Sequence, residues 1–162
     1  MAQFTVELPK EILNQFDKIL FSTDKIFGKM TREGAKVVAN NVRASAPVKA
    51  IRDAVVLTKT YKTPSDDGIN TKVRFRGAIN DGKAFTRRAK TGGTQYTTYK
   101  GTPVEFIAMI TEYGTSARYT NNGRYTGYIG KRPFFRRAFD SAQITAAMLK
   151  VQEKETGGLL KQ

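Results

Sequence analysis

The sequence predicts an α+β fold built as one domain over residues 1–162. Stretches near both ends repeat apolar residues every three or four positions, which is the period of an amphipathic helix. Between them, short segments alternate apolar and polar residues, which is the period of a strand. We therefore expect an N-terminal helix or helix pair and a C-terminal helix packed on a mainly antiparallel sheet, with long projecting loops.

The N-terminal helical region is expected between Pro9 and Pro47. Proline is tolerated in a first helical turn, whereas the residue before a proline disfavours helix, so the two prolines set the limits. "FSTDK" interrupts the pattern, and Ser22 or Thr23 can cap a second helix. The region is therefore one bent helix or two consecutive helices. Its apolar stripe consists of Ile12, Leu13, Phe16, Ile19, Leu20, Ile26, Phe27, Met30, Val37, Val38 and Val42.

Two segments with period two follow, and we expect them to pair as a hairpin. "DAVVLTKTY" is rich in β-branched residues, and "INTKVRFRG" alternates, with the odd-numbered residues from Ile69 to Phe75 on one face. "KTPSDDG" between the two segments is a cluster of turn residues. The opposite face of the second segment carries a basic row of Lys72, Arg74 and Arg76. Such a row is either a solvated sheet face or a binding surface.

Residues 77–103 hold five of the chain's 14 glycines and little apolar sequence, so we expect a long projecting loop or an extended hairpin. "VEFIAMITEY" is then expected as a central strand, apolar on both faces. On a strand, Glu105 and Glu112 would lie on opposite faces, which argues against a paired-carboxylate metal site. Pro133 is expected to start the last helix, and residues 155–162 to form a flexible tail. The buried stripe of that helix would be Phe135, Ala138, Phe139, Ala142, Thr145, Ala146 and Leu149.

The composition restricts the possible functions. The chain has no histidine and no cysteine, so histidine-based catalysis, disulfides and thiolate metal sites are excluded. Carboxylates and lysines remain available, but the sequence predicts no enzyme and no cofactor. Its longest apolar runs span a few residues, so no transmembrane helix is expected, and the first residues do not resemble a secretory signal.

Positive charge is concentrated in the second half of the chain. The net charge is +14, and residues 71–140 contribute +10 of it, from fourteen basic and four acidic residues. This distribution favours a polyanionic partner such as nucleic acid, although an acidic protein neighbour would also suit it. Tyrosines between the basic residues are typical both of single-strand binders and of protein interfaces. The candidate DNA-facing residues are Lys72, Arg74, Arg76, Lys83, Arg87, Arg88 and Lys90.

Several short motifs resemble a known family. "EYGTS" is followed by "KRPFFRRAFD" and preceded by a long helix that ends in "ASAPV". This order resembles the neck or tail-completion proteins of tailed bacteriophages, also described as head–tail connector or minor tail components. The matching residues, spread over about residues 25–150, are Ala46-Pro47-Val48, Arg52-Asp53, Ala108, Glu112-Tyr113-Gly114-Thr115, Arg132-Pro133-Phe134 and Ala138.

The resemblance implies a non-enzymatic structural subunit of the virion, assembled in the host cytoplasm without contact to a membrane. Such a subunit would form a homo-oligomeric ring, a hexamer or a dodecamer, at the head–tail junction. Its neighbours would be the head connector and a tail-tube or tail-terminator protein, with packaged double-stranded DNA in the lumen. The alternative is a free-standing basic nucleic-acid-binding protein. In a ring, the candidate subunit interface is Tyr113, Gly114, Thr115, Arg118, Tyr119, Arg124, Tyr125, Tyr128, Lys131 and Arg132.

Overall fold

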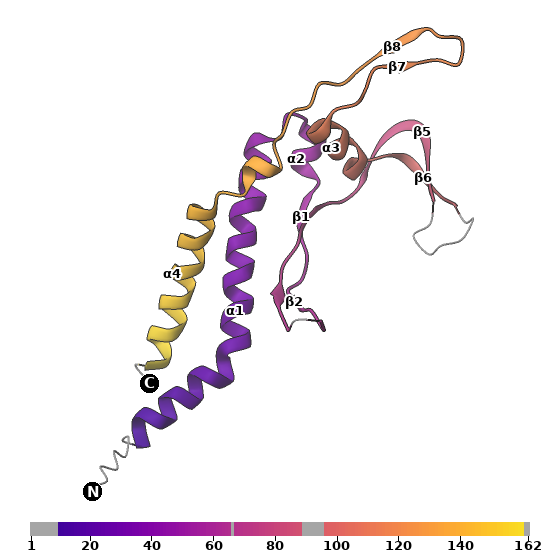
Figure 1. The fold of residues 1–162 in the computed structure, drawn as a ribbon. Helices are drawn as coiled ribbons and strands as arrows, with labels where there is room; N and C mark the ends of the chain where they lie inside the picture. The colour runs from indigo at the N-terminus through magenta and orange to yellow at the C-terminus, as the bar shows by residue number, and fades with distance from the viewer. Residues whose placement is uncertain (1–9, 66, 89–95, 161–162) are drawn as a thin grey trace, which may run out of the picture. The chain divides into compact units, whose positions relative to one another are not determined.

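The computed structural model describes residues 10–65, 67–88 and 96–160, and it confirms the α+β class (Figure 1). The helices are α1 (Lys10–Ser45), α2 (Lys49–Asp53), α3 (Val104–Tyr113) and α4 (Ser141–Leu160), with a 3-10 turn η1 (Arg136–Ala138). The strands are β1 (Val55–Leu57), β2 (Tyr61–Lys62), β3 (Ile69–Asn70), β4 (Val73–Phe75), β5 (Ala78–Arg88), β6 (Tyr96–Pro103), β7 (Arg118–Tyr119) and β8 (Tyr125–Gly127).

The described strands form four two-stranded sheets, β1–β4, β2–β3, β5–β6 and β7–β8, all of them antiparallel. The single larger sheet expected from the sequence is therefore replaced by separate ladders. The chain divides into two compact units. Unit 1 comprises residues 1–35, 59–71 and 141–162, and unit 2 comprises residues 36–58 and 72–140. The single domain expected from the sequence stays a prediction.

The N-terminal region is one helix, and its first turns bend away from the rest of α1 (Figure 1). Ser22 and Thr23 lie inside the helix and do not cap a second one. The Ser22 hydroxyl donates to the carbonyl oxygen of Lys18 at 2.7 Å, and the Thr23 hydroxyl donates to that of Ile19 at 2.9 Å. Hydroxyls that bond back to the preceding turn compete with the helix ladder and promote bending.

In unit 1, α4 packs alongside α1 (Figure 1). A Cβ atom added to Gly34 would lie 3.2 Å from Ile144 and 3.3 Å from Met148, so the absence of a side chain at Gly34 permits this close approach. Farther along, the Lys29 ammonium contacts the Glu155 carboxylate at 2.5 Å. Hydrogen bonding to Lys29 lowers the pKa of Glu155, and Lys29 and nearby lysines add charge attraction.

The C-terminal helix begins later than the sequence predicts. The helix starts at Ser141 and not at Pro133. With this later start, a different side of the helix is buried. Ala142, Thr145, Ala146 and Leu149, which were expected to be buried, are exposed, whereas Ile144, Ala147, Met148 and Val151 are half-buried. The helix also continues through residues 155–160, where the sequence predicts a flexible tail.

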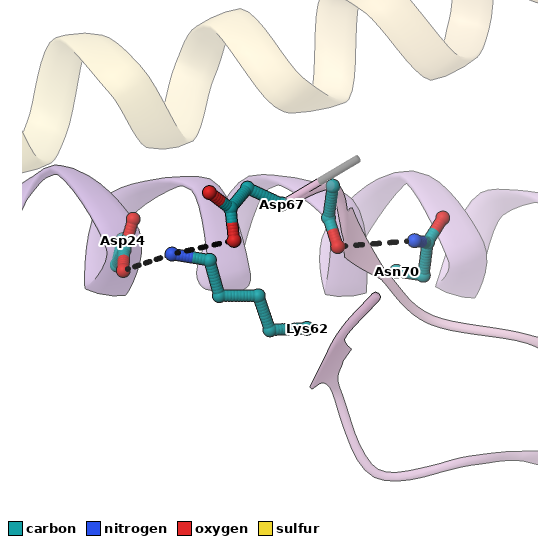
Figure 2. A network of polar contacts seen from close by, with 5 residues as sticks. Asp24, Lys62, Asp67 and Asn70 are labelled. Carbon is teal, nitrogen blue, oxygen red and sulfur yellow. Dashed lines mark hydrogen bonds and ion pairs between the residues drawn. The ribbon is translucent and has the colours of Figure 1, made fainter. Parts of the chain in front are cut away.

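The predicted hairpin between residues 54 and 76 is confirmed, but it consists of two short ladders. In unit 1, Tyr61 pairs with Asn70 across β2 and β3. Figure 2 shows how polar contacts hold this ladder to α1: the Lys62 ammonium lies 3.4 Å from the Asp24 carboxylate and 3.7 Å from that of Asp67. Hydrogen bonding to Asp24, reinforced by both negative charges, raises the pKa of Lys62.

The core of unit 2 lies where the end of α1, α2, the β1–β4 ladder and α3 meet. Val55 pairs with Phe75, and the Arg43 guanidinium donates to the Val55 carbonyl at 3.0 Å. The buried apolar side chains of unit 2 in the described residues are Val38, Ala39, Val42, Ala46, Ile51, Ala54, Val55, Val104, Ala108, Phe134 and Ala138. This small core supports both α3 and the segment that follows it.

The segment "VEFIAMITEY" forms helix α3, so the predicted central strand is wrong. Val104, Ala108 and Thr111 are its buried residues at helical spacing, and Glu112 is buried beside them. Pro103 precedes the helix with a φ of −58°, and Glu105 lies in the first turn, where the helix dipole favours an acidic residue. A short apolar run fits a buried helix as well as a buried strand, and periodicity alone does not separate the two.

Within residues 77–103, the described strands β5 and β6 pair with each other, as in the extended hairpin that was one of the two forms expected from the sequence. Ala78 pairs with Pro103 and Arg88 with Tyr96, with an irregularity in register between Ile79 and Ala84. Gly101 has a φ of +81°, and a side chain there would collide with the Ile79 carbonyl. Among the described residues, no helix is long and apolar enough to cross a membrane.

Candidate assembly surface

The candidate interface residues lie in one continuous segment of unit 2, which begins with Tyr113, the last residue of α3, and ends before η1. A buried carboxylate fixes the base of this segment. Glu112, which is 6% exposed, accepts the backbone N–H groups of Phe134 and Phe135 at 2.8 Å each and that of Arg136 at 3.2 Å. One side chain of α3 thus holds the point at which the chain returns after the intervening 21 residues.

The electrostatics of Glu112 suit this role. Burial alone would raise the pKa of its carboxyl. The N–H groups of Phe135, Phe134 and Arg136, together with the positive charge of Arg136, outweigh burial and lower the pKa of Glu112 below its usual value. The carboxylate is therefore charged at neutral pH, and it forms charge-assisted hydrogen bonds, which are stronger than neutral ones.

Backbone hydrogen bonds extend this anchor along both arms of the segment. The N–H of Arg132 donates to the Thr111 carbonyl at 2.8 Å, and the N–H of Thr115 donates to the Ile129 carbonyl at 2.9 Å. The N–H of Ile129 donates in turn to the Thr115 hydroxyl at 3.0 Å. The outgoing arm at Thr115 and the returning arm at Ile129 are therefore hydrogen-bonded to each other where they leave the body of unit 2.

Gly114 makes the turn out of α3. Its φ of +74° and ψ of −174° are accessible essentially to glycine alone. A Cβ atom there would lie 2.7 Å from the Ile129 carbonyl oxygen and 2.9 Å from the Lys131 nitrogen. Both the backbone conformation and the lack of space therefore require glycine at this position.

Beyond these hydrogen-bonded arms, β7 and β8 form a short hairpin that contributes no buried residue to the core. Tyr119 pairs with Tyr125, and the two rings lie 5.5 Å apart. Between them, Thr120 N–H donates to the Arg124 carbonyl at 2.8 Å, and Arg124 N–H donates to the Thr120 hydroxyl at 3.1 Å. The hairpin is therefore held by its own hydrogen bonds and ring contact, although none of its residues is buried.

Large side chains of the hairpin and its arms point into solvent. Tyr119 is 64% exposed, Tyr125 52% and Tyr128 66%, and Arg118 and Arg124 are also exposed. Lys131 and Arg132 on the returning arm are exposed too. At the end of α3, Tyr113 is 61% exposed, with the Arg136 guanidinium 5.6 Å from its ring centre. The segment therefore presents tyrosine and arginine, the residue types most enriched in the binding hot spots of protein interfaces.

Beside the anchor, α3 and β4 form an open groove of about 250 Å³. Its lining includes Arg74, Phe75, Met109 and Phe134. Glu105 and Glu112 both line the groove. Residues seven apart in a helix share a face, so the predicted placement of these two residues on opposite faces of a strand is wrong. Among the described residues, no cluster of acidic side chains could hold a metal ion.

The three phenylalanines that follow Pro133 differ in burial. Phe134 is buried, at 3% exposed, with its ring 6.2 Å from that of Phe75. Phe135 is half-buried between Phe75 and Phe139. Phe139 is 55% exposed, so its predicted burial is wrong. The cause is again the helix start, because residues 134–140 do not follow the helical face expected from Pro133.

The candidate DNA-facing residues do not form one described cluster. Lys72, Arg74 and Arg76 are exposed along β4 and its flanks, as the alternation predicts. Lys83, Arg87 and Arg88 belong to β5, of which only the backbone is described at these positions, and Lys90 lies outside the described residues. The anchoring role of Glu112 was not predicted from the sequence. A single glutamate in an apolar run does not indicate which distant backbone groups it will bond.

Unit 2 therefore carries an exposed hairpin whose base is anchored by Glu112. The family described as "Bacteriophage HK97-gp10, putative tail-component" matches residues 10–123, which is more than half of the chain, and the chain belongs to this family. It is therefore a structural component of a bacteriophage tail and part of the virion, where it contacts other virion proteins. No curated protein and no solved structure gives a significant match.

Proposed function

We propose that copies of this chain form a ring at the head–tail junction of a tailed bacteriophage, where the ring joins the head connector to the tail tube and lets DNA pass. The chain acts in this proposal without catalysis and without a cofactor. Membership of a tail-component family supports a place in the tail. The ring and its position at the junction are proposed from the resemblance to neck and tail-completion proteins, and the exposed hairpin and basic row of unit 2 are compatible with them.

The observation that carries the proposal is the β7–β8 hairpin. Its base is fixed by Glu112 and by Gly114, whereas its tip exposes Tyr119, Tyr125 and Arg124. A segment held so firmly and yet unused by the core is preorganised for a partner, because little conformational entropy is lost when it binds. In a ring, the same hairpin of each subunit would contact the next subunit or the neighbouring layer.

The exposed basic row Lys72, Arg74 and Arg76 supports passage of DNA. Repeated around a ring, the row would form a collar of positive potential that reaches phosphates within about 8 Å at physiological salt. Such a collar attracts the DNA backbone without reading bases, which suits a genome of any sequence that must pass through.

The assembly role is tested with Arg118→Ala combined with Arg124→Ala. We expect incorporation into virions to fall strongly while the purified variant keeps its fold. The control is Lys150→Ala combined with Lys154→Ala, which removes the same charge from exposed positions on α4. Normal incorporation of the arginine variant would show that the hairpin is not a contact surface.

The role of the basic row is tested by reversing Lys72, Arg74 and Arg76 to glutamate. A lumenal collar predicts normal particle assembly with altered DNA retention or ejection. Failure of ring assembly would place the row in a subunit interface instead. No effect on either would make the row a solvated face and remove the support that it gives to DNA passage.

The alternative, a free-standing nucleic-acid-binding protein, makes a different prediction. It requires measurable DNA affinity that falls steeply as salt increases, because phosphate contacts release counterions. Titration with duplex fragments at several salt concentrations separates the two functions. Nanomolar binding by a monomer at physiological salt would favour the alternative over the ring.

A further inference from the structure

The groove between α3 and β4 has the size and chemistry to receive an aromatic side chain. Most of its lining is apolar, and it includes Phe75, Met109 and Phe134. Met109 is 50% exposed and Tyr113 61%, so this side of the groove is open to solvent. A cavity of about 150 Å³ already holds a benzene molecule. The groove, at about 250 Å³, therefore has room for a ring, and methionine sulfur makes favourable contacts with aromatic groups.

The charges of the groove differ from those of the unit that contains it. Unit 2 has eighteen basic and five acidic residues, which give a net charge of +13. Two of the five acidic residues, Glu105 and Glu112, line the groove together with one basic residue, Arg74. Glu105 is exposed, and the Glu112 carboxylate is charged at neutral pH because its backbone hydrogen bonds lower its pKa. These carboxylates disfavour a phosphate in the groove and favour a cationic side chain.

The β7–β8 hairpin carries the matching groups. Residues 115–130 include two arginines and no acidic residue. Each arginine directly precedes a tyrosine, at Arg118-Tyr119 and Arg124-Tyr125, and this pair of residues occurs nowhere else in the sequence. The rings of Tyr119 and Tyr125 lie 5.5 Å apart and are 64% and 52% exposed. The hairpin therefore presents aromatic rings next to positive charge, which is the combination that the groove can receive.

We propose that the β7–β8 hairpin of one copy docks in the α3–β4 groove of the next copy, with a tyrosine ring against Met109 and an arginine near Glu105. Within one copy, Tyr119, Tyr125 and Met109 are all exposed, so the chain does not cover its own groove with its own hairpin. A contact between two different surfaces of identical chains is head-to-tail, and it closes into a ring when the rotation between copies permits.

This inference rests on the proposed function. It names the partner of the hairpin as the same chain and not a neighbouring layer of the virion. The proposed function can therefore stand when the inference fails, and the experiments below separate the two results.

The first experiment exchanges charges across the contact. Arg118→Glu combined with Arg124→Glu brings like charges together at Glu105 and should lower incorporation into virions at least about tenfold. Adding Glu105→Arg to the same chain restores opposite charges and should recover most of that loss. The control adds Asp53→Arg instead, which makes the same change of charge at an exposed position of unit 2 that does not line the groove. It should recover nothing.

Each other result of the charge exchange has a definite meaning. Normal incorporation of the variant with two glutamates would overturn both the docking and the assembly role of the hairpin. A loss that Glu105→Arg does not recover would overturn the docking alone and leave the hairpin as a contact to a different virion protein. Equal recovery by Asp53→Arg would show an effect of net charge and would also overturn the docking.

The second experiment detects the contact directly. Since the chain has no cysteine, Tyr119→Cys and Met109→Cys each introduce a single thiol, and Tyr125 remains available to dock. The two purified variants are mixed in equal amounts and oxidised, and we expect mixed disulfide dimers in excess of the proportion that random coupling gives. Leu149→Cys replaces Met109→Cys in the control, because Leu149 is exposed to a similar extent, at 47%. A random proportion of mixed dimers, or preferred coupling of Tyr119→Cys with itself, would contradict a head-to-tail contact.

Discussion

The base and the tip of the segment between α3 and η1 differ in almost every physical property, although a few residues of chain connect them. At the base, Glu112 and Phe134 are buried, and the buried carboxylate bonds three backbone N–H groups. At the tip, Tyr119, Tyr125 and Arg124 are exposed, and the hydrogen bonds are those of a local hairpin. The difference indicates that the base supports the fold and leaves the tip available for assembly.

The comparison predicts its largest effect at Phe134. Phe134→Ala should lower the free energy of unfolding by about 3–5 kcal/mol, because the truncation leaves a cavity beside Phe75. Phe139→Ala is the control: this side chain is 55% exposed, and its loss should cost about 1 kcal/mol through the ring of Phe135. Urea unfolding measures both, and equal effects would contradict the placement of the core.

Gly114 should be nearly as sensitive, for a backbone reason. Gly114→Ala forces a side chain into a conformation reserved for glycine and against the Ile129 carbonyl, so we expect a loss of about 3 kcal/mol. Gly123 has the same φ of +74° with open space around it. Gly123→Ala should therefore cost only about 1 kcal/mol. A comparable loss at both positions would show that crowding at the base contributes nothing.

Removing the charge of the anchor should have an intermediate effect. Glu112→Gln keeps the size of the side chain but weakens its bonds to three N–H groups, and we expect a loss of about 2 kcal/mol. Glu105→Gln, at an exposed position in the first turn of α3, should cost less than about 1 kcal/mol. Urea titrations of the two variants at neutral pH provide the comparison, and a larger loss at Glu105 would contradict an anchor at Glu112.

The same anchor predicts a pH dependence. Because the pKa of Glu112 is lowered in the folded state, its stabilisation is fully present above the unfolded-state pKa of about 4.3. The stabilisation is lost as pH falls below that value and through the lower folded-state pKa. Unfolding free energies of the native chain and of Glu112→Gln should therefore differ by a constant amount from pH 7 to about 5 and converge at lower pH. A difference that persists undiminished at pH 2 would exclude ionisation of Glu112 as its source.

The smallest effect on stability is expected at the tip. Arg118→Ala and Arg124→Ala should each change the free energy of unfolding by under about 0.5 kcal/mol, since both side chains are exposed. Thermal melts of these variants are compared with those of Phe134→Ala. A marked fall in melting temperature for either arginine variant would contradict the separation of fold and assembly between base and tip.

Sequence patterns predicted elements whose contacts are local or whose pattern extends over many residues. The long N-terminal helix is confirmed because its apolar spacing repeats over several turns. The hairpin between Val55 and Phe75 is confirmed because alternation and a turn cluster agree. The expected helix limit at Pro47 agrees with the end of α1 at Ser45, because the residue before a proline disfavours helix.

Tertiary structure decided what short segments with ambiguous patterns become. The ten residues of α3 satisfy a buried strand or a buried helix equally well, and the backbone bonds that Glu112 makes more than twenty residues away exist only with the helix in place. The chain that Glu112 bonds at Phe134 and Arg136 does not continue the helix expected from Pro133, and α4 starts only at Ser141. Composition and periodicity therefore determined the α+β class and the basic, histidine-free chemistry of the chain. Packing around one buried carboxylate determined where the exposed hairpin begins and ends, because an interaction between distant residues depends on the folded backbone and not on sequence spacing.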